Sequence, residues 1–162
     1  MKSFIRALGR EAESRATALA TNRGGETATL YFGGGTPSML SDTHLGRLME
    51  TLDRLVPVDK LDEFSFEANP ATFTEKKVRF WRSLGMTRVS LGVQSLDSGI
   101  LHLLGREHTP AQALHSVEML KNAGMAHINM DLMFAIPGQT LSTWEATLRE
   151  AVRAGTDHVS AY

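Results

Sequence analysis

The sequence TATLYF at residues 27–32, followed at once by GGGTP at residues 33–37, predicts a buried strand that ends in a glycine turn. Because glycine lacks a Cβ atom, three in succession allow main-chain N–H and C=O groups to approach a ligand closely and to adopt positive φ angles. Thr36 adds a hydroxyl group to this turn, and Pro37 can open a helix after it. A glycine turn that binds nothing is the alternative interpretation.

Three further runs of strand character end in polar or glycine-containing sequence. They are residues 64–66 before Glu67-Ala68-Asn69-Pro70, residues 88–93 before Gln94-Ser95, and residues 127–134, which carry Asp131 near their end. Apolar spacing and capping residues predict helices over 4–20, from Asp42 to 55, from Thr74 to Gly85, from Pro110 to Gly124 and over 141–154, with a loop at 22–26 and a final strand at 158–162.

This alternation of strands and helices predicts an α/β fold with a parallel sheet, because parallel neighbours need a crossover that returns the chain to the same end. Right-handed crossovers place all carboxyl ends of the strands on one edge, where ligands bind in open α/β sheets and in (βα) barrels. A helix before the first strand and a strand with no helix after it suggest part of a larger TIM-type (βα) barrel. Such a partial barrel has two unpaired edge strands.

Composition limits the classes of protein that the sequence allows. With 162 residues and 42% apolar residues, the chain can build one core of ordinary size, and a second domain is not expected. A formal charge of −1 gives no electrostatic case for nucleic acid or an anionic membrane. No apolar run reaches the length of a membrane span and no signal-peptide core follows the first residues, so we expect a cytoplasmic protein. The chain has no cysteine, and its histidines lack metal-ligand spacing, so we expect no metal site formed by this chain.

Five motifs occur in a fixed order: YFGGGTPS at 31–38, FEANP at 66–70, RVSLGVQS at 88–95, LGREH at 104–108 and NMDLMFAIPGQT at 129–140. With these motifs the chain resembles the radical S-adenosylmethionine (radical SAM) proteins related to oxygen-independent coproporphyrinogen III oxidase, and most closely their HemW haem-chaperone branch. The family carries a CxxxCxxC loop for a [4Fe-4S] cluster after its first strand. The resemblance therefore implies that residues 1–162 form a single incomplete core domain, strands 2 to 6 of a radical SAM barrel, without that loop.

The resemblance also implies roles for particular residues. The backbone of Gly33, Gly34, Gly35 and Thr36 matches the motif that takes the amino and carboxylate groups of S-adenosylmethionine, and Glu67 matches a carboxylate on the bound cofactor. Gln94 and Asp131 match positions near the ribose or a second cofactor molecule, and Arg106 matches an arginine that pairs with a carboxylate. No catalytic residue is assigned to this chain.

Each of these residues also has a structural interpretation. Glu67 could cap a helix or lie in a turn, Gln94 could satisfy backbone groups at the end of a strand, and Arg106 with His108 could form a solvated loop. Asp131 is different, because it is flanked by apolar residues in a strand and an unpaired buried carboxylate is costly. We therefore expect Asp131 to have a partner or a ligand.

The resemblance implies a chain that holds S-adenosylmethionine while a [4Fe-4S] cluster supplies the electron for its cleavage. Because thiolates hold such clusters and the chain has none, we expect it to be inactive alone. Three functions stay open at this point: the cofactor-binding part of a radical SAM enzyme acting on a porphyrinogen, a haem-binding chaperone that delivers haem, and a partial barrel that binds nothing.

Overall fold

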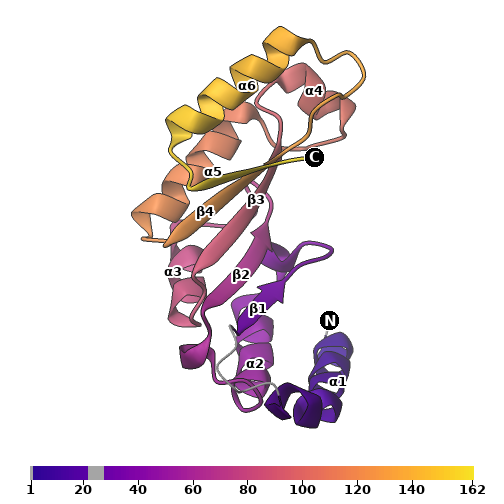
Figure 1. The fold of residues 1–162 in the computed structure, drawn as a ribbon, viewed down its shortest axis with the longest axis vertical. Helices are drawn as coiled ribbons and strands as arrows, with labels where there is room; N and C mark the ends of the chain where they lie inside the picture. The colour runs from indigo at the N-terminus through magenta and orange to yellow at the C-terminus, as the bar shows by residue number, and fades with distance from the viewer. Residues whose placement is uncertain (1, 22–27) are drawn as a thin grey trace.

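The structure, a computed structural model, describes residues 2–21 and 28–162, and the side chains of residues 2–16 and 28–162. The predicted loop at 22–26 and the first residue of the predicted strand, Thr27, lie outside the described residues. In Figure 1 the chain runs from the helices at the lower end of the molecule, through a sheet, to a group of helices at the upper end.

Five parallel strands form one sheet whose spatial order follows the sequence, as β1-β2-β3-β4-β5. The strands are β1 (Thr29–Phe32), β2 (Glu63–Ala68), β3 (Arg88–Gln94), β4 (His127–Leu132) and β5 (His158–Ala161). The sheet is not closed, and β1 and β5 are its two edges. The α/β class and the partial barrel predicted from the sequence are therefore confirmed.

The helices fall close to their predicted positions. They are α1 (Lys2–Thr21), α2 (Asp42–Asp53), α3 (Glu75–Ser83), α4 (Ser98–Leu103), α5 (Pro110–Asn122) and α6 (Leu141–Ala154), with single 3-10 turns at Pro37–Met39 and Val58–Lys60. The sequence prediction missed α4, a helix of only 6 residues that begins where Asp97 accepts a hydrogen bond from the Ile100 N–H. No helix of the described part of the chain has the length and apolar character needed to cross a membrane.

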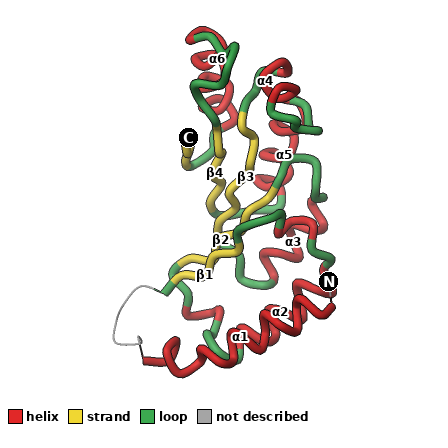
Figure 2. Tube along the Cα trace, turned by 90° about the vertical axis from the view of Figure 1, so that its right-hand side faces the viewer, coloured by secondary structure: helices red, strands yellow, loops and turns green. Residues whose placement is uncertain are grey.

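The two faces of the sheet differ in chemistry and in cover. Figure 1 shows α3, α5 and α6 along one side of the strands, and the turned view of Figure 2 shows the opposite face without a helix over it in the described residues. The covered face is apolar, and its fully buried side chains pack on the helices; they include Phe64, Phe66, Val89, Leu91, Ile128, Met130 and Leu132. We call this the outer face.

The opposite, uncovered face carries the alternate residues of the same strands, because successive side chains of a strand point to opposite sides. The register pairs Glu67 with Ser90, Ser90 with Asn129, and Asp131 with Ser160, so these side chains share one face, which we call the inner face. At its amino-terminal end, Arg88 Nε donates to Glu63 Oε2 at 2.6 Å. The inner face thus presents a polar surface that leads up to the carboxyl ends of the strands.

The carboxyl end of β3 departs from regular strand geometry. The register between β3 and β4 shifts between Leu91 and Gln94, and Gln94 has a φ of 68°. Such a break in the strand register turns a side chain away from its regular direction. Gln94 is the last residue of β3 and lies at the same edge of the sheet as the glycine turn.

Candidate functional site

A cleft of about 360 Å³ lies at the carboxyl ends of the strands, at the upper edge of the inner face. Its lining includes six of the residues predicted from the sequence, namely Gly35, Thr36, Glu67, Gln94, Arg106 and Asp131. Gly33 and Gly34 line the neighbouring groove between α1, β1 and α2 instead. The structure thus brings residues from four strands and their loops to one place, as the parallel topology predicts.

The glycine turn after β1 is bound to Glu67. The Gly34 N–H donates to Glu67 Oε2 at 2.9 Å, and the Tyr31 hydroxyl donates to Glu67 Oε1. This hydrogen bond to the carboxylate raises the pKa of Tyr31. The alternative in which Glu67 caps a helix or lies in a turn is wrong, because Glu67 lies within β2 and its carboxylate holds the glycine turn.

The three glycines of the turn are needed for different reasons. A Cβ atom on Gly33 would lie 2.3 Å from Cε1 of Tyr31 and 2.9 Å from Oε1 of Glu67, so the contact between these side chains requires glycine. Gly34 and Gly35 have φ angles of 79° and 61°, a region that residues with a side chain rarely adopt, and nothing lies within 4 Å of their missing Cβ atoms. Their backbone is therefore open to a ligand on that side.

Arg106 reaches into the cleft from the loop between α4 and α5. Its Nη2 donates to Asn69 Oδ1 at 2.9 Å and to the Gly92 carbonyl at 3.0 Å. Gly92 permits this crossing, since a Cβ there would lie 2.9 Å from Asn69 Oδ1 and 3.5 Å from Arg106 Nη2. The solvated-loop alternative is wrong for Arg106, which is half-buried and bonded in the cleft.

The same alternative is also wrong for His108. Its side chain is buried, and its Nε2 lies 3.1 Å from the Val93 carbonyl. Burial lowers the pKa of His108, because a charged imidazolium is poorly solvated there. His108 therefore anchors the loop that carries Arg106 to the end of β3.

Asp131 has the partner that the sequence analysis expected. Its Oδ1 accepts a hydrogen bond from Asn129 Nδ2 at 2.8 Å. Burial raises the pKa of Asp131, and the nearby Glu67 carboxylate adds to the rise, while hydrogen bonds from Asn129 and Ser160 oppose it. A half-buried carboxylate that lines the cleft is suited to accept a hydrogen bond from a ligand hydroxyl.

Other residues of the cleft were not selected from the sequence. Asn69 joins its two sides, since its Nδ2 donates to Thr36 Oγ1 at 3.3 Å while its Oδ1 accepts from Arg106. Ser90 and Gly92 line the floor of the cleft. The period of two along β3 could have found both, because Ser90 and Gly92 alternate with Val89 and Leu91 on the way to Gln94.

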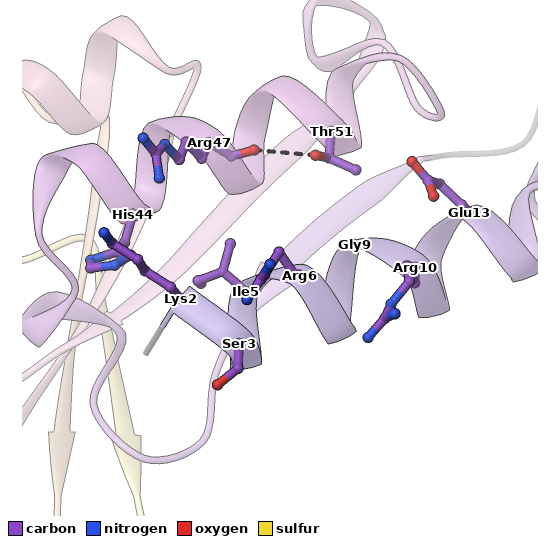
Figure 3. Close-up of a pocket in the computed structure, with 10 residues that line it drawn as sticks. All are labelled: Lys2, Ser3, Ile5, Arg6, Gly9, Arg10, Glu13, His44, Arg47 and Thr51. Carbon is purple, nitrogen blue, oxygen red and sulfur yellow. Dashed lines mark hydrogen bonds between the residues drawn. The ribbon is translucent and has the colours of Figure 1, made fainter.

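Another groove, of about 690 Å³, lies between α1 and α2 and is separate from the one that Gly33 and Gly34 line. Its lining includes Lys2, Arg6, Arg10, His44 and Arg47. Its cationic side chains do not converge on one point: Figure 3 shows Lys2 extending toward His44 and Arg10 pointing away from α2. The candidate site is the cleft at the ends of the strands, where side chains from separate loops bond to one another.

Comparison with known protein families gives one match that covers most of the chain. Residues 9–151 match the model of the radical SAM superfamily. The chain belongs to the radical SAM superfamily.

The chain is also similar to curated proteins of known name. The chain is 37% identical over 134 residues to a protein of Lactococcus lactis named heme chaperone HemW, a match that covers 83% of this chain and 35% of that protein. It is 32% identical over 146 residues to the Danio rerio protein named radical S-adenosyl methionine domain-containing protein 1, mitochondrial, covering 90% of this chain and 33% of that protein. The chain thus spans about a third of the length of these relatives.

Solved structures agree with the radical SAM fold. The coproporphyrinogen III oxidase HemN of Escherichia coli, described as a radical SAM enzyme, superposes with a TM-score of 0.85 at 26% identity, over 99% of this chain and 36% of that one. The archaeal Elp3 of Methanocaldococcus infernus superposes with a TM-score of 0.75 at 22% identity, over 94% of this chain and 40% of that one, a likeness of fold alone. The family resemblance stated from the sequence motifs is confirmed.

Full-length members of this superfamily imply two cofactors, S-adenosylmethionine and a [4Fe-4S] cluster. The cleft fits the first, because a zwitterion with hydroxyl groups needs backbone polar groups, carboxylates and a cation, and the cleft is lined by the backbone of Gly35 and Thr36, by Glu67 and Asp131, and by Arg106. The residues present do not fit the second, since Fe–S clusters are held by thiolates and the 162 residues include no cysteine. No step through the cluster can be derived from this chain.

Proposed function

We propose that this chain is the S-adenosylmethionine-binding part of a longer, HemW-type radical SAM protein of haem or porphyrin metabolism, and that residues 1–162 form one incomplete core domain of it. The observation that carries the proposal is the convergence of the glycine turn, Glu67, Arg106 and Asp131 on one cleft. On its own, without thiolate ligands, the chain is expected not to cleave the cofactor.

In this proposal different parts of the cleft bind different parts of the cofactor. The turn from Gly33 to Thr36 offers backbone N–H and C=O groups to the methionine amino and carboxylate groups, with Glu67 beside them. Arg106 presents a planar guanidinium, which pairs with a carboxylate better than a lysine does. Gln94 and Asp131, at the ends of β3 and β4, accept hydrogen bonds from the ribose hydroxyls or from a second cofactor molecule.

A thermal unfolding experiment with S-adenosylmethionine tests this proposal, with S-adenosylhomocysteine as the comparison ligand. A site at a hundredfold excess of ligand over its dissociation constant adds about 2.7 kcal/mol of stability, so a saturable rise in Tm is expected. The variant Gly34→Val should remove the rise and Asp131→Asn should reduce it, and both variants should still unfold cooperatively. A cooperative chain without any ligand-dependent rise would support the third interpretation, a barrel fragment that binds nothing.

A second function is favoured by the relatives alone. The curated relatives named heme chaperone HemW suggest that the whole protein binds haem and delivers it, in place of oxidising a porphyrinogen. Mixing the chain with haemin and recording the Soret band tests this directly. A saturable shift of the band with 1:1 stoichiometry supports a haem-binding role for these residues, and an unchanged spectrum assigns any haem site to the rest of the protein.

A further inference from the structure

Asn129 is the most highly connected polar side chain of the inner face. It lies on β4 between β3 and β5, and only 4% of it is exposed. Its amide contacts Asp131 Oδ1 at 2.8 Å, Ser90 Oγ at 3.0 Å and Ser160 Oγ at 3.0 Å through Nδ2, and His158 Nδ1 at 2.7 Å through Oδ1. One buried amide therefore joins three neighbouring strands directly below the cleft.

The chemistry of the partners determines how this amide is turned. An ionised carboxylate only accepts hydrogen bonds, so the NH2 group of Asn129 must face Asp131. Its carbonyl oxygen then faces β5, and the nitrogen of His158 that contacts it must carry a proton. The orientation of Asn129 is thus determined from both sides, by the acceptor Asp131 and by the donor His158.

This arrangement acts on Asp131 in two ways. The hydrogen bond from Asn129 to Oδ1 fixes the direction of the carboxylate at the edge of the cleft, which Asp131 lines. Burial raises the pKa of Asp131, and the hydrogen bonds from Asn129 and Ser160 lower it, so they favour the charged form. Asn129 itself is not among the residues that line the cleft, and it acts through Asp131.

We propose that Asn129 is a positioning residue of the cleft, which holds the Asp131 carboxylate in the direction needed to accept hydrogen bonds from the hydroxyl groups of the bound cofactor. The identity of that cofactor rests on the proposed function. The coupling between Asn129 and Asp131 does not, and it can be measured without any ligand.

The first test follows the carboxyl carbon of Asp131 by NMR during a pH titration of the chain. The variant Asn129→Ala should raise the pKa of Asp131, because a hydrogen bond to the charged form is lost. In the unchanged chain, the chemical shifts of the side-chain amide protons of Asn129 should change with pH at the same midpoint as Asp131. This measurement needs no variant, so it can be made even if Asn129→Ala fails to fold. Amide protons that do not follow Asp131 would overturn the proposal.

The second test measures S-adenosylmethionine affinity as a function of pH. Because Asn129 acts through Asp131, Asn129→Ala should weaken binding near neutral pH by no more than the loss of about tenfold expected for Asp131→Asn. Affinity should also begin to fall at a higher pH in Asn129→Ala than in the unchanged chain, because Asp131 is then protonated earlier. Within the described residues, Glu67, His158 and Tyr31 interact electrostatically with Asp131 and Arg106 lines the same cleft, so the same pair of titrations is repeated in an Asp131→Asn background.

In that background the pH-dependent effect of Asn129→Ala should vanish, since the group through which Asn129 acts is gone. Ser65→Ala is the matched control: Ser65 is equally buried on the inner face, but its hydroxyl bonds Glu63 and no member of the Asn129 network. It should leave the pKa of Asp131 and the affinity unchanged. If Asp131→Asn does not alter affinity, the proposed function fails; if it does and Asn129→Ala does not, the role of Asn129 fails.

Discussion

The outer and inner faces of the sheet are stabilised by different kinds of interaction. Along β3, Val89 and Leu91 are fully buried under helices, while Ser90 and Gly92 point to the opposite side and line the cleft. On the outer face, apolar area removed from water stabilises the fold without regard to direction. On the inner face, each polar group needs a partner in a particular direction, because a buried polar group without one is costly.

Because the two faces use different interactions, the same strands contribute to stability through one face and to ligand binding through the other. Substitutions on the outer face should change the free energy of unfolding, whereas substitutions on the inner face should change affinity and pH dependence more than stability.

Phe66→Ala, on the outer face, should cost about 3–5 kcal/mol of unfolding free energy because it leaves a cavity. Phe66 is completely buried, and its ring centre lies 4.8 Å from that of Trp81. Ser90→Ala, on the inner face, should cost about 1 kcal/mol, the value of one hydrogen bond, here that to Asn129. Urea denaturation measures both, and equal costs would contradict the contrast between the faces.

Arg106→Ala should lower affinity for S-adenosylmethionine about 10-fold to 100-fold, since hydrogen bonds to charged groups are worth about 1.5–3 kcal/mol. Arg106→Lys should restore only part of this loss, because an ammonium group that replaces Nη2 in its bonds to Asn69 and the Gly92 carbonyl leaves no planar pair of donors for a ligand carboxylate. Calorimetric titration of both variants measures the affinities. Full restoration by lysine would show that only the charge of Arg106 matters.

Asp131→Asn should lower affinity about tenfold, the value of one hydrogen bond to a charged group, without lowering stability at neutral pH. Burial raises the pKa of Asp131, so the stability that its protonated form contributes is lost as pH rises through that pKa. A neutral amide avoids this loss. Urea denaturation at pH 3 and pH 7 should therefore show the variant gaining relative to the unchanged chain at the higher pH, and a relative loss there would contradict the direction of the shift.

His108 should give the smallest effect, a fraction of that of Phe66→Ala. Burial lowers its pKa, so the stability that the neutral imidazole contributes is present above its ordinary pKa and lost as pH falls through the lowered value. His108→Gln should therefore make the unfolding free energy less sensitive to acid below about pH 6.5. Melting curves of both chains from pH 7 to pH 5 test this. An unchanged pH dependence would show that His108 does not contribute to the loss of stability in acid.

Much of the architecture could be predicted because it depends on local pattern. The apolar runs at β2, β3 and β4 and the helix-start residues Asp42, Thr74 and Pro110 predicted strands and helices close to those observed. Parallel topology then predicted that Glu67, Gln94 and Asp131 meet at one edge, and they line one cleft. Their role in binding a cofactor stays a prediction, since no comparison tests it.

The contacts within the cleft could not be predicted, because they join residues far apart in the chain. The helix α4 was missed since a 6-residue helix carries too little periodicity. Arg106 was open to a solvated interpretation, and only its bonds to Asn69 and Gly92 place it in the cleft.

The sequence by itself determined the order of strands and helices, the glycine turn and the absence of thiolate ligands, because spacing, backbone freedom and residue type are local properties. Tertiary structure alone decided that Tyr31 and Gly34 hold Glu67, and that Asn129 of β4 meets Ser90 of β3 and His158 of β5. Hydrogen bonds act over about 3 Å and in fixed directions, so such partnerships exist only once the strands have been brought into register.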